Sequence, residues 1–188
     1  MAVQRQQIVV ERLFQNYKML IDRVDTRCHE IESTLSGHMA CHRGCSNCCM
    51  NISLFPVEAI GLRLSLETLE AEEKEAIVSS ALHAKKEGAC PLLDGDGACR
   101  LYGDRPLICR THGLPILFED EAGVRKVDFC PDNFGGLTSL SGDLMLDVDA
   151  LNQMLTAVNA AFCESLFQGH PPFDRVTISD ALQLELDV

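Results

Sequence analysis

The chain lacks tryptophan and has few other aromatic residues, so its core must be built mainly from leucine, valine, isoleucine and alanine. Its 188 residues include no Trp, 2 Tyr and 8 Phe, although 46% of all residues are hydrophobic. A chain of this length and composition can bury a substantial core, and we expect residues 1–188 to form a single domain.

Long apolar runs and excess positive charge are also missing. No stretch of 18 apolar residues occurs, so we expect no membrane span. The formal net charge of -12 argues against a nucleic-acid partner, which requires clustered Lys and Arg, and against an anionic membrane surface. Residues 1–7 carry neither an apolar signal core nor a cleavage site, which predicts a cytoplasmic protein.

The common motifs of nucleotide binding and nucleophilic catalysis are absent as well. The glycine pairs at 95–97 and 135–136 have no strand-to-helix context. No Ser-His-Asp or Cys-His arrangement can be told apart from metal ligands. The sequence therefore leaves open whether the chain is an enzyme, and any catalysis would have to run through a metal.

Cysteine is what the chain has in abundance. Eight of its ten cysteines fall within residues 41–130, and the first four follow the spacing Cys-x3-Cys-x2-Cys-Cys. In a reducing cytosol, thiols gathered this densely predict a metal site, whereas a disulfide scaffold would require an exported protein. The predicted ligands are Cys41, Cys45, Cys48, Cys49, Cys90, Cys99, Cys109 and Cys130.

Four thiolates suit either zinc or an iron–sulfur cluster, and eight can form two such sites. Adjacent Cys48 and Cys49 point in different directions in extended or helical backbone, so the pair could serve two centres. Only Cys45-x2-Cys48 has the spacing of a zinc knuckle, and the later intervals are irregular. We therefore favour an iron–sulfur cluster of the [4Fe-4S] type and keep zinc as the alternative.

The triad Cys41-x3-Cys45-x2-Cys48 also has the spacing found in radical S-adenosylmethionine enzymes. Those enzymes place the triad after the first strand of a large α/β barrel. Here the triad follows a long predicted helix in a short chain, which argues against that class.

Apolar periodicity predicts helices on both sides of the cysteines. The pattern indicates helices over residues 4–36, 56–66, 70–86, 149–168 and 179–186. Cys28 and Cys163 lie on the apolar faces of the first and fourth of these helices, so we expect both to be core residues and not ligands. Asp149 is expected to cap its helix through its carboxylate.

Residues 88–134 differ in composition from the helical segments, because Gly and Pro are frequent and apolar runs are short. Residues 114–118 and 124–129 alternate enough to predict a short hairpin. The expected fold is mainly α: a small helical scaffold with a cysteine-rich, loop-rich metal-binding insert and a short β-hairpin. Metal would supply the cross-links that this insert needs, and the whole metal-binding region, 41–131, is flanked by helices.

These cysteine motifs resemble a known family, the CxxxCxxCC cysteine-cluster proteins with a zinc- or iron-chelating domain. The stretches that carry the resemblance are residues 41–49, 90–102, 105–110 and the pair Cys130-Pro131. The resemblance covers residues 41–131 and implies metal binding by the eight cysteines. A larger relative, a flagellin lysine methylating enzyme, has a similar iron–sulfur cluster, but its methylating activity is not carried over to this chain.

Several polar residues beside the cysteines are candidates for supporting roles. Arg105 and Arg110 can donate hydrogen bonds toward thiolate sulfurs or neutralise the charge of the site. His42 and His112 are candidate ligands or hydrogen-bond donors, although histidines near metal sites commonly do neither. Tyr102 is expected to be a packing residue with a partner for its hydroxyl group.

Three functions fit these observations. The one we favour is an iron–sulfur protein in electron transfer or redox sensing, whose acidic surface steers it toward a basic protein redox partner. A zinc-binding structural or chaperone-like module is the second. The third is a metal-dependent enzyme with an open coordination site.

Overall fold

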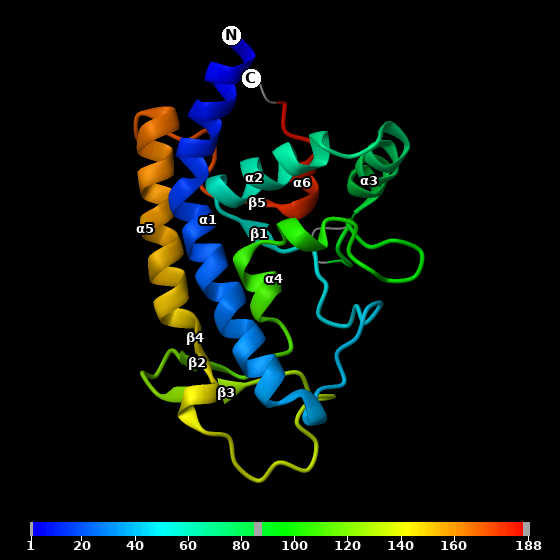
Figure 1. Cartoon of the computed structure of the whole chain (residues 1–188), viewed down its shortest axis with the longest axis vertical. Helices are drawn as coiled ribbons and strands as arrows, with labels where there is room; N and C mark the ends of the chain where they lie inside the picture. Colours follow the sequence, from blue (N-terminus) through cyan, green and yellow to red (C-terminus); the bar gives the residue numbers. More distant parts are fainter. Residues whose placement is uncertain (1, 85–87, 186–188) are drawn as a thin grey trace.

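The computed structural model describes residues 2–84 and 88–185, with side chains from residue 12 onward. Helices dominate this part of the chain (Figure 1). They are α1 (Ala2–Thr34), α2 (Pro56–Glu67), α3 (Ala71–His83), α4 (Leu107–Thr111), α5 (Val148–Phe167), α6 (Ile178–Leu182) and the 3-10 turns η1 (Ser36–His38), η2 (Tyr102–Asp104) and η3 (Gly142–Leu144). The strands are β1 (Ser53–Leu54), β2 (Ile116–Glu119), β3 (Arg125–Asp128), β4 (Leu146–Asp147) and β5 (Val176–Thr177). The predicted class, mainly α with a short β element, is confirmed.

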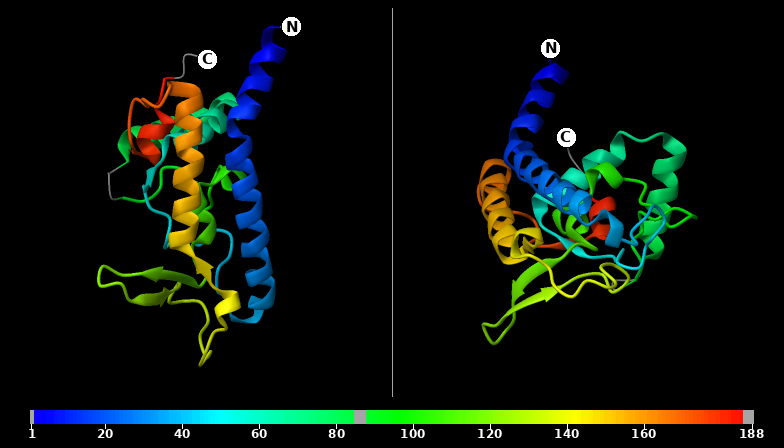
Figure 2. Two further views of the ribbon diagram at one scale, coloured as in Figure 1. Left: turned by 90° about the vertical axis from the view of Figure 1, so that its left-hand side faces the viewer. Right: turned by 60° about the horizontal axis from the view of Figure 1, so that its bottom comes forward.

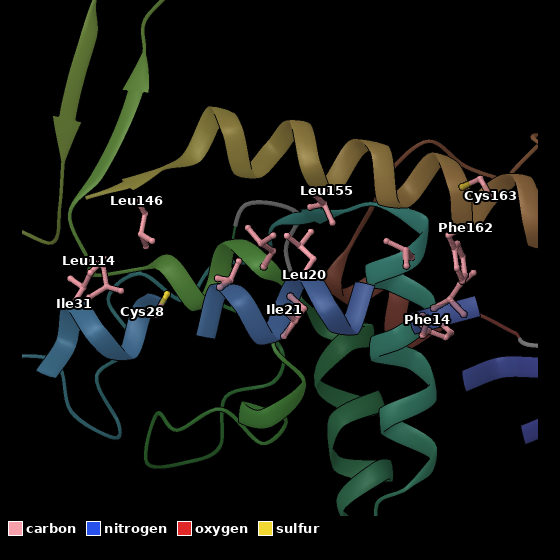
Figure 3. Packing of buried hydrophobic residues seen from close by; sticks show 14 of the residues in the cluster. Phe14, Leu20, Ile21, Cys28, Ile31, Leu114, Leu146, Leu155, Phe162 and Cys163 are labelled. Atoms are coloured by element: carbon pink, nitrogen blue, oxygen red, sulfur yellow. The ribbon is translucent and has the colours of Figure 1, made fainter. Parts of the chain in front are cut away.

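Helices α1 and α5 run antiparallel to each other along the long axis of the molecule (Figures 1 and 2). Their apolar positions recur every three or four residues, so each helix presents one buried face. The rings of Phe14 and Phe162 meet between them with centroids 5.0 Å apart. Cys28 and Cys163 lie in this first hydrophobic cluster and are each 5% exposed (Figure 3). Their predicted role as core residues is confirmed.

A second hydrophobic cluster joins α2, α3 and α6, with Leu66 and Ile77 completely buried. The cysteine-rich insert contributes to both clusters. Leu92 and Leu101 pack in the second cluster, and Leu107 and Leu114 pack in the first. Each of these four leucines is at most 4% exposed. The insert therefore shares the core of the helical scaffold and is less dependent on cross-links than its sequence suggests.

The predicted hairpin forms from β2 and β3, which pair antiparallel from Ile116↔Asp128 to Glu119↔Arg125. It projects from the lower end of the α1–α5 pair (Figure 2). Two further pairings were not predicted: β4 lies parallel to β2, and β1 lies antiparallel to β5. The strands that these pairings add have only two residues each, too few to show an alternating pattern.

The start of α5 differs from the prediction. Asp147, and not Asp149, caps the helix by accepting a hydrogen bond from the backbone N–H of Ala150 at 3.0 Å. Asp149 instead accepts the N–H of Glu119 at 2.7 Å and so ties the hairpin to α5. Leu166, near the end of α5, is 41% exposed.

Other element boundaries shift by a few residues. Helix α1 ends at Thr34 and helix α6 ends at Leu182, both earlier than predicted. Residues 86 and 186, at which α3 and α6 were predicted to end, lie outside the described residues. Helix α4 was not predicted, because five residues are too few for a helical period to show.

Searched over the described residues, no helix is both long and apolar enough to cross a membrane.

Candidate metal centre

The first four cysteines lie on the loop between η1 and β1, with Cys41 exposed and the other three half-buried. Two glycines with positive φ allow this loop to lie directly against the loop at residues 94–98. A Cβ at Gly44 would lie 2.9 Å from the carbonyl oxygen of Asp96, and one at Gly97 would lie 2.7 Å from that of Gly44. Only glycine permits this close approach. The two glycines therefore allow the segment that carries the first four cysteines to meet the segment between Cys90 and Cys99.

The backbone then brings the next cysteines beside Cys49. The N–H of Cys90 donates to the carbonyl of Cys49 at 3.1 Å, and the flanking residues Met50 and Ala89 form an antiparallel β-bridge. A second bridge pairs Leu93 with Cys99.

Burial raises the pKa of Cys109, on α4, to about 12, and repulsion from Cys90, Cys49 and Cys99 adds to the effect. We call these four cysteines the inner group: Cys49, Cys90, Cys99 and Cys109.

A buried asparagine organises the surroundings of Cys41. Asn133, 1% exposed, donates its Nδ2–H to the Cys41 Sγ at 3.2 Å and to the Gly113 carbonyl at 2.7 Å. Its Oδ1 accepts the N–H of Ala40 at 2.8 Å. Its own N–H donates to the carbonyl of Cys130 at 2.9 Å, which places the Cys130 segment against the Cys41 loop.

A second contact joins the same two segments, between Asn47 Nδ2 and Asp132 Oδ2 at 3.4 Å. Burial raises the pKa of Cys48 to about 11, and repulsion from Cys49 and Cys41 contributes. We call the four remaining predicted ligands the outer group: Cys41, Cys45, Cys48 and Cys130.

The two arginines of the motif have different roles. Burial raises the pKa of Cys49, Cys99 and Cys109, and the guanidinium of Arg105 acts in the opposite direction on all three. Arg105 also donates to the Cys109 carbonyl at 3.4 Å and lies 3.6 Å from the ring centroid of Tyr102. It is thus the cation that faces the inner group, as the sequence suggested.

Arg110 is a structural residue instead. Its guanidinium is buried and forms an ion pair with Asp25 of α1 at 2.5 Å. It also donates to the carbonyls of Arg105 at 2.7 Å and Gly103 at 2.6 Å. The side chain therefore fixes the turn before α4 against α1, and these hydrogen bonds go to oxygen atoms and not to a sulfur.

Glu58 positions the helix that carries Cys109. It is only 4% exposed, and its Oε1 accepts the N–H of Leu107, the first residue of α4, at 3.0 Å. Its Oε2 accepts the N–H of Phe55 at 3.2 Å and so caps α2 as well. Burial raises the pKa of this carboxyl group. A Glu at the third position of a helix that begins with proline is the available sequence signal for the cap on α2.

The other candidates have ordinary surroundings. The Nδ1 of His42 lies 2.9 Å from the carbonyl of Ala40. His112 is half-buried, and burial lowers its pKa, with the charge of Arg105 acting in the same direction. Tyr102, expected to pack, is 62% exposed beneath Arg105. Sequence reasoning missed Asn133 and Glu58, which contact the cysteine loops and α4 directly.

The chemistry of the donor set fits a soft metal, since all ten cysteines are free thiols. Among the described residues, however, no group of three or more His, Cys, Asp or Glu side chains is already placed to hold a metal ion.

Residues 40–131 match the sequence profile of a family, CxxCxxCC, whose description is "putative zinc- or iron-chelating domain". The match spans 92 of the 188 residues, just under half of the chain. Searches of curated proteins and of solved structures each returned no match. The CxxCxxCC domain contains all eight predicted ligands and excludes Cys28 and Cys163. Between its first two cysteines it has one residue more than the family name spells out, and the family supports binding of zinc or iron.

Proposed function

We propose that this chain is an iron–sulfur protein that works in electron transfer or redox sensing. The proposal is supported by eight free thiols within residues 40–131, the segment that matches a zinc- or iron-chelating family, on loops that share the core of the scaffold. Thiolates in this number match the ligand needs of iron–sulfur clusters, and the bound cluster would supply one-electron chemistry.

The anchoring of the insert supports a redox role over a purely structural one. A structural zinc site typically replaces a missing core, as in small domains that unfold without metal. Here Leu92, Leu101 and Leu107 anchor the insert by packing in the hydrophobic clusters of the scaffold. A metal is then free to serve a task other than holding the fold.

The position of the cysteines suits exchange of electrons with another protein. Cys41 is exposed and the other predicted ligands are half-buried, so a centre held by them lies close to the surface. The net charge of -12 would steer a basic redox protein toward this acidic molecule. We therefore propose a basic electron-transfer protein as the partner.

Zinc is the second candidate, because the family description names zinc beside iron. A cysteine-rich site binds zinc tightly, and the chain would then be a structural or chaperone-like module. The irregular intervals after Cys49 are not those of paired zinc knuckles, which is why we place zinc second.

Anaerobic purification followed by iron, zinc and acid-labile sulfide analysis tests the proposal. We expect brown protein with iron and sulfide in comparable amounts, because a cluster contains sulfide and a zinc site does not. The variants Cys28→Ser and Cys163→Ser should retain the colour, since both residues lie in the core. Colourless protein with stoichiometric zinc and no sulfide would establish the zinc module instead.

A further inference from the structure

We propose that the outer face of the α1–α5 pair is the contact surface of a symmetric dimer, in which the α5 helices of two copies of this chain pack antiparallel. Met154 of each copy enters a recess on the other copy, beside Ala161. This inference concerns the helical scaffold and does not depend on the metal-binding function proposed above.

A recess of about 250 Å³ opens between the outer sides of α1 and α5. Its apolar lining comes from Leu13 of α1 and from Val158, Ala161 and Phe162 of α5. Among the described side chains that line it, none is a carboxylate. In the left view of Figure 2 the two helices stand side by side, and no other drawn element lies in front of them. The recess is therefore open on the outside of the scaffold.

The exposed side of α5 is unusual for this chain because it has no charge. Residues 150–163 contain no Asp, Glu, Lys, Arg or His, although the chain carries a formal net charge of -12. A helix that faces water normally has charged residues on its outer side, and α3 follows this rule with Glu72 and Glu73 in its first turn. Helix α5 instead exposes Ala157 and Met154, the latter by 43%. Such a face is typical of contact with another protein surface.

The charge of the molecule indicates which partner fits this face. A basic protein is drawn to carboxylates, and the lining of the recess offers it none. Two copies of this chain each have a formal net charge of -12, so they repel each other wherever their carboxylates meet. On the uncharged side of α5 two copies can approach without bringing carboxylates together. The occupant that fits is therefore a second copy of this chain.

Met154 and the recess are spaced for a reciprocal contact. Met154 precedes Val158 by four residues and Ala161 by seven, so the three lie on one side of α5. With a twofold axis between Ala157 and Val158, antiparallel helices place position 154 of one copy opposite position 161 of the other. The flexible methionine side chain then fills the space above the small alanine. Each copy contributes one methionine and receives one.

The two helices are long enough for a stable interface. Helix α5 has 20 residues, and two adjacent helices about 30 Å long and about 10 Å wide each provide a face of about 600 Å². A specific interface needs roughly 500 Å² on each copy. Figure 1 shows α5 and the loop that carries the first four cysteines on opposite sides of α1, so the dimer leaves this loop accessible.

Sedimentation equilibrium of the unmodified chain from about 1 to 100 μM tests the proposal. A thiol reductant is present to prevent disulfide-linked association through the free cysteines. We expect a monomer–dimer equilibrium that added salt strengthens, because salt screens the repulsion between two acidic molecules. A monomer at every concentration, or a dimer that dissociates as salt is raised, would overturn the proposal.

Charged variants test whether the dimer forms through α5. Ala157→Glu should weaken dimerisation more than about tenfold, because two carboxylates would face each other at the axis. Ala157→Lys alone should have the same effect, and an equimolar mixture of the two variants should dimerise again. Asn152→Glu is the matched control and should leave dimerisation unchanged, since this exposed position is turned away by about 140°. Circular dichroism checks that each variant is folded.

Two outcomes would show that the dimer does not use this face. One is equal dimerisation of the folded Ala157→Glu and Asn152→Glu variants. The other is a mixture of Ala157→Glu and Ala157→Lys that remains monomeric, because a symmetric axis beside residue 157 must bring the opposite charges together.

Discussion

Single polar side chains, and not only cysteines, shape this site. Asn133 uses both ends of its amide to connect Ala40, the Cys41 sulfur and Gly113. Such a donor to a ligand sulfur fixes the direction of the ligand and tunes its basicity. The buried amide is thus a positioning residue for the outer group, although it binds no metal.

Asn133→Ala should weaken metal binding at the outer group by about 10–100-fold, the usual cost of losing a hydrogen bond behind a ligand. It should also lower the free energy of unfolding by about 1–3 kcal/mol, because the N–H of Ala40 loses its partner. Cobalt titration and urea denaturation measure the two effects. Asn152→Ala, at an exposed position on α5, is the matched control. Equal affinities of both variants would contradict the role of Asn133.

Arg105 supplies the positive charge that faces the inner group. In the iron–sulfur form, Arg105→Gln should lower the reduction potential, because a nearby cation stabilises the more negative reduced state. One screened charge is worth on the order of 1 kcal/mol, which for one electron is roughly 40 mV. Redox titration measures the shift, and Arg105→Lys should restore most of it. An unchanged potential in the glutamine variant would remove Arg105 from the electrostatics of the site.

The sequence identified the cysteines, whose affinity for metal belongs to the residue type itself. It missed residues whose role depends on where the fold places them. Closely spaced cysteines in a sequence indicate metal binding, so the eight cysteines could be predicted as ligands. Asn133 and Glu58 are ordinary polar residues until the fold buries them beside backbone N–H groups. Arg105 and Arg110 have similar sequence surroundings, yet only the first faces the cysteines.

At the scale of elements, predictability follows length. Helices α1 and α5 have 33 and 20 residues, so their apolar periods are unmistakable. Helix α4 has five residues and no visible period, although it carries Cys109. The carboxylate of Glu58 links α2 to α4, and this makes the position of α4 sensitive to one substitution.

The carboxyl group of Glu58 gives the link a pH dependence. Burial raises its pKa, so the folded chain binds this proton more tightly than the unfolded chain does. The contribution of Glu58 to stability is therefore fully present below the ordinary carboxyl pKa and is lost as pH rises through the raised value. Thermal unfolding of the metal-free protein across this range should show the decline.

Glu58→Gln should flatten that part of the profile, since an amide does not titrate. It should also lower stability by about 1–3 kcal/mol, because an amide nitrogen cannot accept one of the two backbone N–H groups. Glu67→Gln is the control, at an exposed carboxylate whose pKa is lowered by hydrogen bonds from Lys74 and Arg63. Identical pH profiles for the unmodified chain and Glu58→Gln would contradict the assignment.

At the scale of the whole molecule, the helical scaffold and the cysteine loops are connected by leucines. Leu92 and Leu101 reach one hydrophobic cluster and Leu107 and Leu114 the other, so the loops are anchored at both ends of the insert. The sequence indicated the mainly α class and the location of the insert, because helices and cysteines have local signals. It did not reveal this anchoring, because four leucines spread over a loop have no period that assigns them to a cluster.

The anchoring defines what metal removal should do to the molecule. Between the leucines, the cysteine segments have few buried apolar side chains to hold them in place without metal. Hydrogen exchange after chelation should therefore rise most in residues 88–134 and least in α1 and α5, whose faces are continuously buried. Within the insert, amides beside Leu92 and Leu107 should stay better protected than those at 94–98. Equal loss of protection in the insert and in α5 would mean that the metal supports the entire fold, which would favour a structural zinc site over a redox centre.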